Sequence, residues 1–393
     1  MLNTPFSPWP SFTKEEADAV SRVLLSNKVN YWTGSECREF EKEFSAWAGC
    51  EHAVALSNGT LALDVALKAL NIGKGDEVIT TPRTFLASAS SIVTAGANPV
   101  FADVDLNSQA ITAESIEAVL TPKTKAVIVV HLAGMPAEMD AIMALSEKHG
   151  FYVIEDCAQA HGAKYKGRSV GTIGHIGAWS FCQDKIMTTG GEGGMVTTND
   201  KELWSKMWSY KDHGKNYDAI YNRQHPPGFR WLHESFGTNW RMTELQAVLG
   251  RIQLTRMSSW TKQRQENGEQ IDEAVADLNV VRRVQVPEYS EHAEYKHYLF
   301  IEPQHLAEGW TRDRIVETIV ERGVPAYQGS CSEVYLEKAF DNTQWRPAER
   351  LPNAVQLGET SLMFLVHPTL TSEEVAKTCQ VIREVLLEAQ SNS

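Results

Sequence analysis

Residues 125–157 read KAVIVVHLAGMPAEMDAIMALSEKHGFYVIEDC, which predicts a strand, a helix and a second strand in succession. The run KAVIVVHLAG (125–134) is almost wholly apolar, as expected of a strand that is buried on both faces. MDAIMALSEKHG (139–150) has apolar residues at helical spacing, and FYVIEDC (151–157) predicts the next strand. Repetition of this kind is typical of a mostly parallel sheet that helices cover on both faces.

The same alternation of strands and helices runs through the first 200 residues. Short runs of strand-like composition and runs with helical spacing of apolar residues follow one another, separated by turns that contain glycine. They are EHAVALS (51–57), TLALDVALKAL (60–70), DEVIT (76–80), ASASSIVTAG (87–96) and NPVFADVD (98–105). We therefore expect an α/β fold.

The pattern changes near residue 240. MTELQAVLGRIQLTRMSSWTKQR (242–264) has apolar residues on one face and predicts one long helix that leaves the sheet. Residues 280–393 predict a smaller α/β unit. We expect a large domain over residues 1–250, and the connecting helix with a small C-terminal domain over residues 251–393.

Composition excludes several classes of protein. The chain has 393 residues, of which 42% are hydrophobic, so disorder is not its dominant state. The net charge of −13 opposes a nucleic-acid partner. The six cysteines are scattered without a C-x-x-C pair, which favours a reducing cytoplasm over a disulfide scaffold or zinc site. We expect no membrane span and no signal peptide, because no long apolar run occurs.

The first segment with chemical potential is Ser57-Asn58-Gly59-Thr60, a predicted turn between a strand and a helix. Backbone N–H groups at a helix N-terminus form a site for an anion, and the Thr60 hydroxyl adds a donor. An ordinary helix cap explains the same residues and is the more common use of such a turn. Alone, this segment is weak evidence for an anion site.

The second segment is Glu155-Asp156, at the carboxyl end of a predicted buried strand. Ligands of open α/β sheets bind at such strand ends. A buried carboxylate needs a cation or hydrogen-bond donors, and the protonated nitrogen of a pyridine ring would serve Asp156. A structural aspartate paired with an arginine or backbone amides is an equal alternative.

The third segment places Lys185 between the predicted strand GAWSF (177–181) and the glycine-rich run TTGGEGG (188–194). A lysine there can form a Schiff base with a carbonyl compound. A surface lysine on a loop is the ordinary alternative. Together, an anion turn, an acid for a ring nitrogen and an amine for an imine meet the binding needs of pyridoxal 5′-phosphate.

Longer blocks of the sequence resemble one family, the DegT/StrS-type sugar aminotransferases, which are pyridoxal-phosphate enzymes of fold type I. The resemblance covers almost the whole chain and includes SNGTLALDVALKALNIGKGDEVI (57–79), VIEDCAQAHGA (153–163) and GTNWRMTELQAVLGRIQL (237–254). It implies one large cofactor-binding domain, a small C-terminal α/β domain and a homodimer with shared active sites. The glycine loop has one more glycine than the shorter T-T-G-E-G-G version.

The resemblance also implies roles for individual residues. Lys185 matches the lysine that holds the cofactor as a Schiff base and later carries the proton between cofactor and substrate. Asp156 matches the acid that keeps the pyridine nitrogen protonated, and Gln159 matches the residue that hydrogen-bonds the 3′ oxygen. The phosphate ligands match Gly59, Thr60 and Ser180.

Two more residues receive roles in the same way, each with a structural alternative. Phe85 matches the aromatic residue that stacks on the cofactor ring, although it could simply belong to the core. Asn239 matches the asparagine that reaches the phosphate of the neighbouring subunit, although it could support the helix cap at Thr243. His131 and His161 are interpreted as core histidines, and Glu192 as a residue that orders the glycine loop.

The implied reaction is a ping-pong amino transfer. An amino acid, which is L-glutamate in most of the family, gives its amine to the cofactor. The keto sugar of a dTDP-, UDP- or GDP-linked deoxysugar then takes the amine. The product would serve surface polysaccharide, lipopolysaccharide, O-antigen or glycoside biosynthesis. The aromatic loop 214–240 is expected to lie over the substrate, with Arg223, Arg230 and Arg241 as candidates for a diphosphate or carboxylate, or as ordinary ion-paired arginines.

Three other functions fit the sequence less well. A sugar dehydratase on the same fold replaces the lysine by histidine, so Lys185 argues against it. A non-catalytic sensor or regulator would be favoured by loss of Lys185 or Asp156, and both are present. A nicotinamide-dependent oxidoreductase is weaker still, because no G-x-G-x-x-G follows an early strand.

Overall fold

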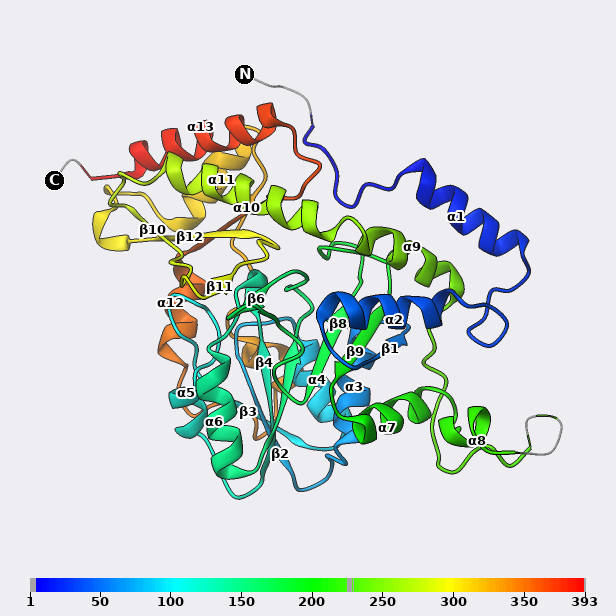
Figure 1. The fold of residues 1–393 in the computed structure, drawn as a ribbon. Helices are drawn as coiled ribbons and strands as arrows, with labels where there is room; N and C mark the ends of the chain where they lie inside the picture. The colour runs from blue at the N-terminus through cyan, green and yellow to red at the C-terminus, as the bar shows by residue number, and fades with distance from the viewer. Residues whose placement is uncertain (1–4, 225–227, 229, 392–393) are drawn as a thin grey trace.

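The computed structural model describes residues 5–224, 228 and 230–391, and Figure 1 shows their arrangement. The centre is a seven-stranded sheet with the strand order β1-β9-β8-β5-β4-β2-β3. Its strands are β1 (His52–Leu56), β2 (Glu77–Thr80), β3 (Asn98–Phe101), β4 (Thr124–Val130), β5 (Tyr152–Asp156), β8 (Ile176–Ser180) and β9 (Gly194–Thr198). Within this sheet β9 runs antiparallel to both its neighbours, while the pairs from β8 through β3 are parallel. The predicted α/β fold with a mostly parallel sheet is therefore confirmed.

Both faces of the central sheet are buried, which explains the uniformly apolar strands. On one face Ala126 and Ile128 of β4 join a core cluster with the apolar residues of α3 (Gly59–Ala69). On the other face Val127 and Val129 pack with α6 (Met139–His149). Alternate residues of one strand thus serve two separate cores. Further helices are α1 (Lys14–Leu25), α2 (Glu36–Ala48), α4 (Ala87–Thr94), α5 (Ala113–Glu117), α7 (Lys201–Lys211) and α8 (Tyr217–Tyr221).

The C-terminal part forms a second sheet, with the order β10-β12-β14-β13, and all its pairs are antiparallel. Its strands are β10 (Val281–Arg283), β12 (His297–Ile301), β13 (Ala326–Tyr327) and β14 (Ser361–Phe364), and its helices are α11 (Arg312–Glu321), α12 (Pro352–Thr360) and α13 (Ser372–Ala389). A small three-stranded sheet joins β11 (Ser290–Glu291) to β6 (Lys164–Tyr165) and β7 (Arg168–Ser169). The proposed division at residue 250 remains an expectation.

Two predicted elements have different bounds in the structure. The long helix is two helices, α9 (Glu244–Leu254) and α10 (Met257–Ala274), because the chain leaves helical hydrogen bonding at Thr255 and Arg256. The apolar run 125–134 is a strand only to Val130, and residues 132–134 turn as a short 3-10 helix. No helix of the described ranges combines the length and apolar character that a bilayer crossing requires.

Candidate active site

The carboxyl ends of the parallel strands bring the predicted residues to one edge of the sheet. The turn at Ser57 follows β1, Asp156 ends β5, and Ser180 ends β8, with Lys185 five residues further on. Parallel strands end on the same side of a sheet, so residues far apart in sequence meet there. The structure thus gathers the three segments that the sequence singled out.

The turn at residues 57–60 is both a helix cap and an open anion site. The Asn58 side chain accepts a hydrogen bond from the Leu61 amide at 3.0 Å, so it caps α3. Gly59 and Thr60 are the first residues of that helix, and their N–H groups have no acceptor within it. Thr60 is exposed. The ordinary cap and the anion site are therefore compatible uses of one turn.

Gly59 lies directly against Ser180. A Cβ atom built on Gly59 would stand 2.5 Å from the Ser180 Cβ and 2.9 Å from its Cα. This contact places the N-terminus of α3 beside the Ser180 hydroxyl, so amide and hydroxyl donors converge where the phosphate of a cofactor is expected. The glycine is required here by the close approach to backbone atoms of β8.

Changing Gly59 to alanine is therefore expected to weaken binding of pyridoxal phosphate roughly tenfold, because the added methyl group forces α3 and β8 apart. Equilibrium titration of apoprotein with the cofactor, followed by its absorbance, measures the effect. Gly73→Ala is the matched control, since its nearest neighbour would be the Ala95 oxygen at 3.6 Å. If Gly59→Ala and Gly73→Ala bind pyridoxal phosphate with equal affinity, the turn at Gly59 does not hold the phosphate.

Asp156 is a buried carboxylate that has hydrogen bonds but no cation. It accepts from the Ser88 hydroxyl at 2.8 Å and from the Ala158 amide at 3.1 Å. Burial raises the pKa of Asp156, while the hydrogen bonds from Ala158 and Ser88 and the charge of Lys185 oppose that rise. Of the structural alternative, the pair with arginine does not occur among the described residues, but the contact with a backbone amide does, at Ala158. A protonated ring nitrogen would supply the cation that this buried carboxylate lacks among the described residues.

Gln159 is held in one orientation by the backbone. Its Oε1 accepts a hydrogen bond from the Ala133 amide at 2.7 Å. Because an N–H can only donate, this contact identifies the oxygen of the side-chain amide and leaves its NH2 group as a donor. Gln159 is 8% exposed. A donor here suits an oxygen anion on a bound ring.

Lys185 is half-buried in the segment between β8 and β9. Its ammonium lies 5.3 Å from the centre of the Tyr295 ring. The Tyr295 hydroxyl donates to Asp184 at 2.6 Å, and the Trp9 indole donates to the Lys185 carbonyl oxygen at 2.8 Å. The backbone of the lysine is thus anchored, while its amine forms no ion pair with a described residue.

Phe85 is 71% exposed, so the core alternative for this residue is wrong. It lies in the segment between β2 and α4, two residues before Ala87, the first residue of α4. Asn239 does not cap a helix, because Thr243 and Gln246 form the capping box of α9 by themselves. Asn239 is exposed and pairs through its backbone with Asp212. Both predicted side chains are therefore accessible to a ligand or another subunit.

The three loop arginines differ in their surroundings. Arg241 donates to Asp212 at 2.6 Å, and Arg223 pairs with Asp218 and Glu234. Two of the candidates thus take the ordinary ion-paired role. Arg230 is exposed and forms no ion pair with a described residue. Part of the predicted substrate loop, residues 225–227 and 229, lies outside the described residues.

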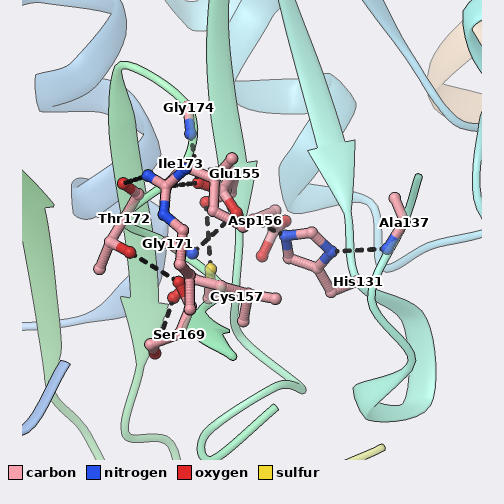
Figure 2. A network of polar contacts seen from close by, with 12 residues as sticks. His131, Ala137, Glu155, Asp156, Cys157, Ser169, Gly171, Thr172, Ile173 and Gly174 are labelled. Atoms are coloured by element: carbon pink, nitrogen blue, oxygen red, sulfur yellow. Dashed lines mark hydrogen bonds and ion pairs between the residues drawn. The ribbon is translucent and has the colours of Figure 1, made fainter. Parts of the chain in front are cut away.

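Sequence reasoning missed the role of Glu155, which Figure 2 shows at the centre of a buried polar network. Its carboxylate accepts from His131 Nε2 at 2.9 Å and from the amides of Gly171, Ile173 and Gly174 at 2.7, 2.8 and 2.6 Å. Burial opposes ionisation, but these hydrogen bonds lower the pKa of Glu155. Glu155 therefore ties the loop after β7 to the strand that carries Asp156.

His131 is a satisfied core histidine, as expected. Its Nδ1 accepts from the Ala137 amide at 3.1 Å, which leaves Nε2 as the donor to Glu155 (Figure 2). His131, Glu155 and Cys157 could hold a metal ion by distance, but hydrogen bonds already occupy the Glu155 oxygens. His161 is also a core histidine, but it is not satisfied, because neither ring nitrogen has a hydrogen-bond partner among the described residues. Burial, with the charges of Lys185 and Arg264, lowers its pKa to about 3.

Comparison with known proteins adds a family match and close relatives. Residues 10–383 match the model of the DegT/DnrJ/EryC1/StrS aminotransferase family. An aminotransferase structure from Psychrobacter cryohalolentis is 65% identical, with a TM-score of 0.96, and covers 98% of this chain and 100% of its own. UDP-N-acetyl-3-dehydro-alpha-D-glucosamine 3-aminotransferase of Acidithiobacillus ferrooxidans is 36% identical over 98% of this chain and 96% of its own. GDP-perosamine synthase of Escherichia coli O157:H7 is 34% identical over 95% of this chain and 96% of its own.

Proposed function

Because the chain belongs to the DegT/DnrJ/EryC1/StrS aminotransferase family, we propose that it transfers an amino group from L-glutamate to the keto sugar of a nucleotide-linked deoxysugar. The protein is a pyridoxal-phosphate-dependent sugar aminotransferase of fold type I. The nucleotide, the sugar and the donor are parts of the proposal. The observation that carries it is the meeting of Gly59, Asp156 and Lys185 at one edge of the sheet.

The described residues fit pyridoxal phosphate. Gly59, Thr60 and Ser180 would bind the phosphate through amides and hydroxyls. Asp156 would hold a proton on the ring nitrogen, and the NH2 group of Gln159 would donate to the ring oxygen. When bound, the cofactor supplies the electron sink that stabilises negative charge on the substrate carbon.

The lysine amine has two tasks in this account. It would hold the cofactor through its aldehyde before substrate arrives, and it would then move the proton at the reacting carbon. The Trp9 indole donates to the Lys185 carbonyl oxygen at 2.8 Å. Because this contact fixes the backbone, the side chain can change partners while the backbone stays in place. The exposed ring of Phe85 would stack on the cofactor ring and exclude water from one face.

A homodimer with shared active sites is part of the proposal. Asn239 is exposed and would reach the phosphate of the neighbouring subunit. Phe85 and Phe236 are 71% and 100% exposed, and aromatic side chains of this kind are typical of interfaces. Leu56 and Arg241 form a backbone bridge, and the Ser57 amide donates to the Trp240 oxygen at 3.0 Å, so the Asn239 segment borders the phosphate turn of its own subunit. An interface at this segment would bring the phosphate turns of both subunits close to it.

Mixed dimers test the shared site. A chain with Lys185→Ala and a chain with Asn239→Ala, each inactive or impaired alone, are expected to regain one intact site when combined if Asn239 acts across the interface. If Asn239 serves its own subunit, the mixture contains no intact site in the heterodimer. Activity of separately tagged and purified heterodimers distinguishes the two arrangements, and a monomeric mass in solution contradicts both.

We place the reaction in the cytoplasm, in the synthesis of a surface polysaccharide, lipopolysaccharide, O-antigen or glycoside. Its test is a two-step assay. L-Glutamate should bleach the yellow protein to the amine form of the cofactor, and one member of a panel of UDP-, dTDP- and GDP-linked keto sugars should restore the colour and gain an amine by mass. A protein that glutamate bleaches but that no keto sugar nucleotide restores would contradict the proposed acceptor class.

A further inference from the structure

Three cationic side chains gather around Tyr295, beside the reactive lysine. The ammonium groups of Lys185 and Lys296 lie 5.3 Å and 4.9 Å from the centre of the same Tyr295 ring. Arg264 of α10 reaches the backbone of this segment, where its Nη1 donates to the Tyr295 carbonyl oxygen at 3.3 Å. The guanidinium also lies over the Trp9 ring, 4.9 Å from its centre. Residues from three parts of the chain thus place positive charge around Tyr295.

This positive charge has little compensation within the described chain. No described carboxylate forms a salt bridge with Lys185, Lys296 or Arg264. Two acids act on these cations without an ion pair: Asp184, whose carboxylate accepts from the Tyr295 hydroxyl at 2.6 Å, and Glu294, which pairs with His292 and His297. Arg264 is 1% exposed, and its Nε and Nη2 atoms have no hydrogen-bond partner in the part of the chain that the structure describes. A buried guanidinium with unused donors is costly unless an anion arrives.

The pKa values of Lys296 and Arg264 agree with the absence of an ion-pair partner for either side chain among the described residues. Burial, together with the charges of Arg264 and Lys185, lowers the pKa of Lys296 to about 8, although Asp184 opposes the shift. Burial lowers the pKa of Arg264 to about 9. A bound anion would restore both values toward the ordinary range. Lys296 is half-buried, whereas Arg264 is 1% exposed.

The position of this charge decides which substrate anion it suits. The amine of Lys185 marks where the bond to the donor nitrogen is exchanged, and the α-carboxylate of an amino acid is attached to the carbon next to that nitrogen. The phosphate turn at Gly59 supplies a separate anion site beside Ser180. In a nucleotide sugar, the diphosphate is several bonds away from the carbon that accepts the amine. Because Lys185 and Lys296 both lie against the Tyr295 ring, this position favours the donor carboxylate over the diphosphate.

We propose that Lys296 binds the α-carboxylate of the amino-acid donor, with Arg264 as the fixed positive charge behind it. This inference rests on the proposed amino transfer and adds the donor-binding residue to it. The α-carboxylate of the donor would form a charge-assisted hydrogen bond with the ammonium of Lys296. Neither another described residue of the chain nor the cofactor phosphate supplies an equivalent contact. The keto sugar lacks this carboxylate, so the same contact is absent when the acceptor binds.

Changing Lys296 to methionine tests the contact, since methionine keeps an unbranched chain and removes the charge. The concentration of L-glutamate that half-bleaches the yellow holoenzyme should rise roughly 30-fold or more. The affinity for L-2-methylglutamate, which has no α-proton to lose, should fall by a similar factor in calorimetry. Reaction of the amine form with the keto sugar nucleotide should stay unchanged, and Lys296→Arg should recover much of the donor affinity.

Lys262→Met is the control, because Lys262 is an exposed lysine on the same helix as Arg264 and pairs with Glu266. A carboxylate-free amine such as n-butylamine should react equally with wild type and Lys296→Met. A Lys296→Met protein with normal affinity for both glutamate and 2-methylglutamate overturns the inference. A loss confined to the sugar nucleotide step overturns it in favour of the diphosphate. Wild-type protein that ignores glutamate would instead contradict the proposed function.

Discussion

Replacing Lys185 by alanine is expected to reduce amino transfer by at least about 10³-fold, the largest loss for any single side chain in this protein. The amine is required twice, to bind the cofactor aldehyde and to move a proton, so no neighbouring group can replace it. Lys296 lies on the same Tyr295 ring but is held near Arg264. Single-turnover rates of bleaching by glutamate give the measurement.

The control for this change is Lys262→Ala, which removes an exposed lysine and should retain wild-type rates. Circular dichroism establishes that the Lys185→Ala chain is folded. Added methylamine should restore part of the proton-transfer rate, because a free amine can enter the space of the missing side chain. A Lys185→Ala protein that retains a tenth or more of the wild-type rate would show that another residue carries the proton.

Replacing Asp156 by asparagine is expected to slow amino transfer by roughly 10²-fold, corresponding to about 3 kcal/mol for the loss of one charge from a buried pair. Asparagine has nearly the same shape, and its oxygen can still accept from Ser88 or Ala158. It cannot hold a positive ring nitrogen, so the cofactor withdraws electrons less strongly. The cofactor should still bind and colour the protein, which separates this effect from misfolding.

The turnover number at saturating substrates measures the Asp156→Asn effect, and the absorbance spectrum reports the protonation of the bound ring. Asp140→Asn is the control, because Asp140 is exposed on α6 and pairs with Lys166 at the surface. It should leave the rate and the spectrum unchanged. If Asp156→Asn behaves like Asp140→Asn, then Asp156 is a structural residue and the proposed partner of the ring nitrogen must lie elsewhere.

The sheet and the three chemical segments could be predicted because their signals are local. The apolar run around Ile128 indicates a strand buried on both faces, and both cores are present in the structure. Capping boxes at Thr13, Thr243 and Thr371 begin α1, α9 and α13. The carboxyl ends of parallel strands share an edge, which brings Gly59, Asp156 and Ser180 together.

The contacts that sequence reasoning missed are those that depend on tertiary packing. Glu155 alternates with Asp156 along β5, but its three amide donors come from residues 171–174, whose loop path no local pattern predicts. Arg264 reaches the segment that carries Lys296 because α10 lies against the backbone just before β12. The exposure of Phe85 likewise follows from its position after β2, since an aromatic residue alone suggests the core.

Reductive trapping tests the central claim most directly. Holoenzyme treated with borohydride and then digested should give one peptide that carries the reduced cofactor, and fragmentation should place it on Lys185. Glutamate added before borohydride should prevent the labelling, because it converts the cofactor to its amine form. A label on any other lysine, or labelling that glutamate does not prevent, would contradict the account of this protein as an aminotransferase that acts through Lys185.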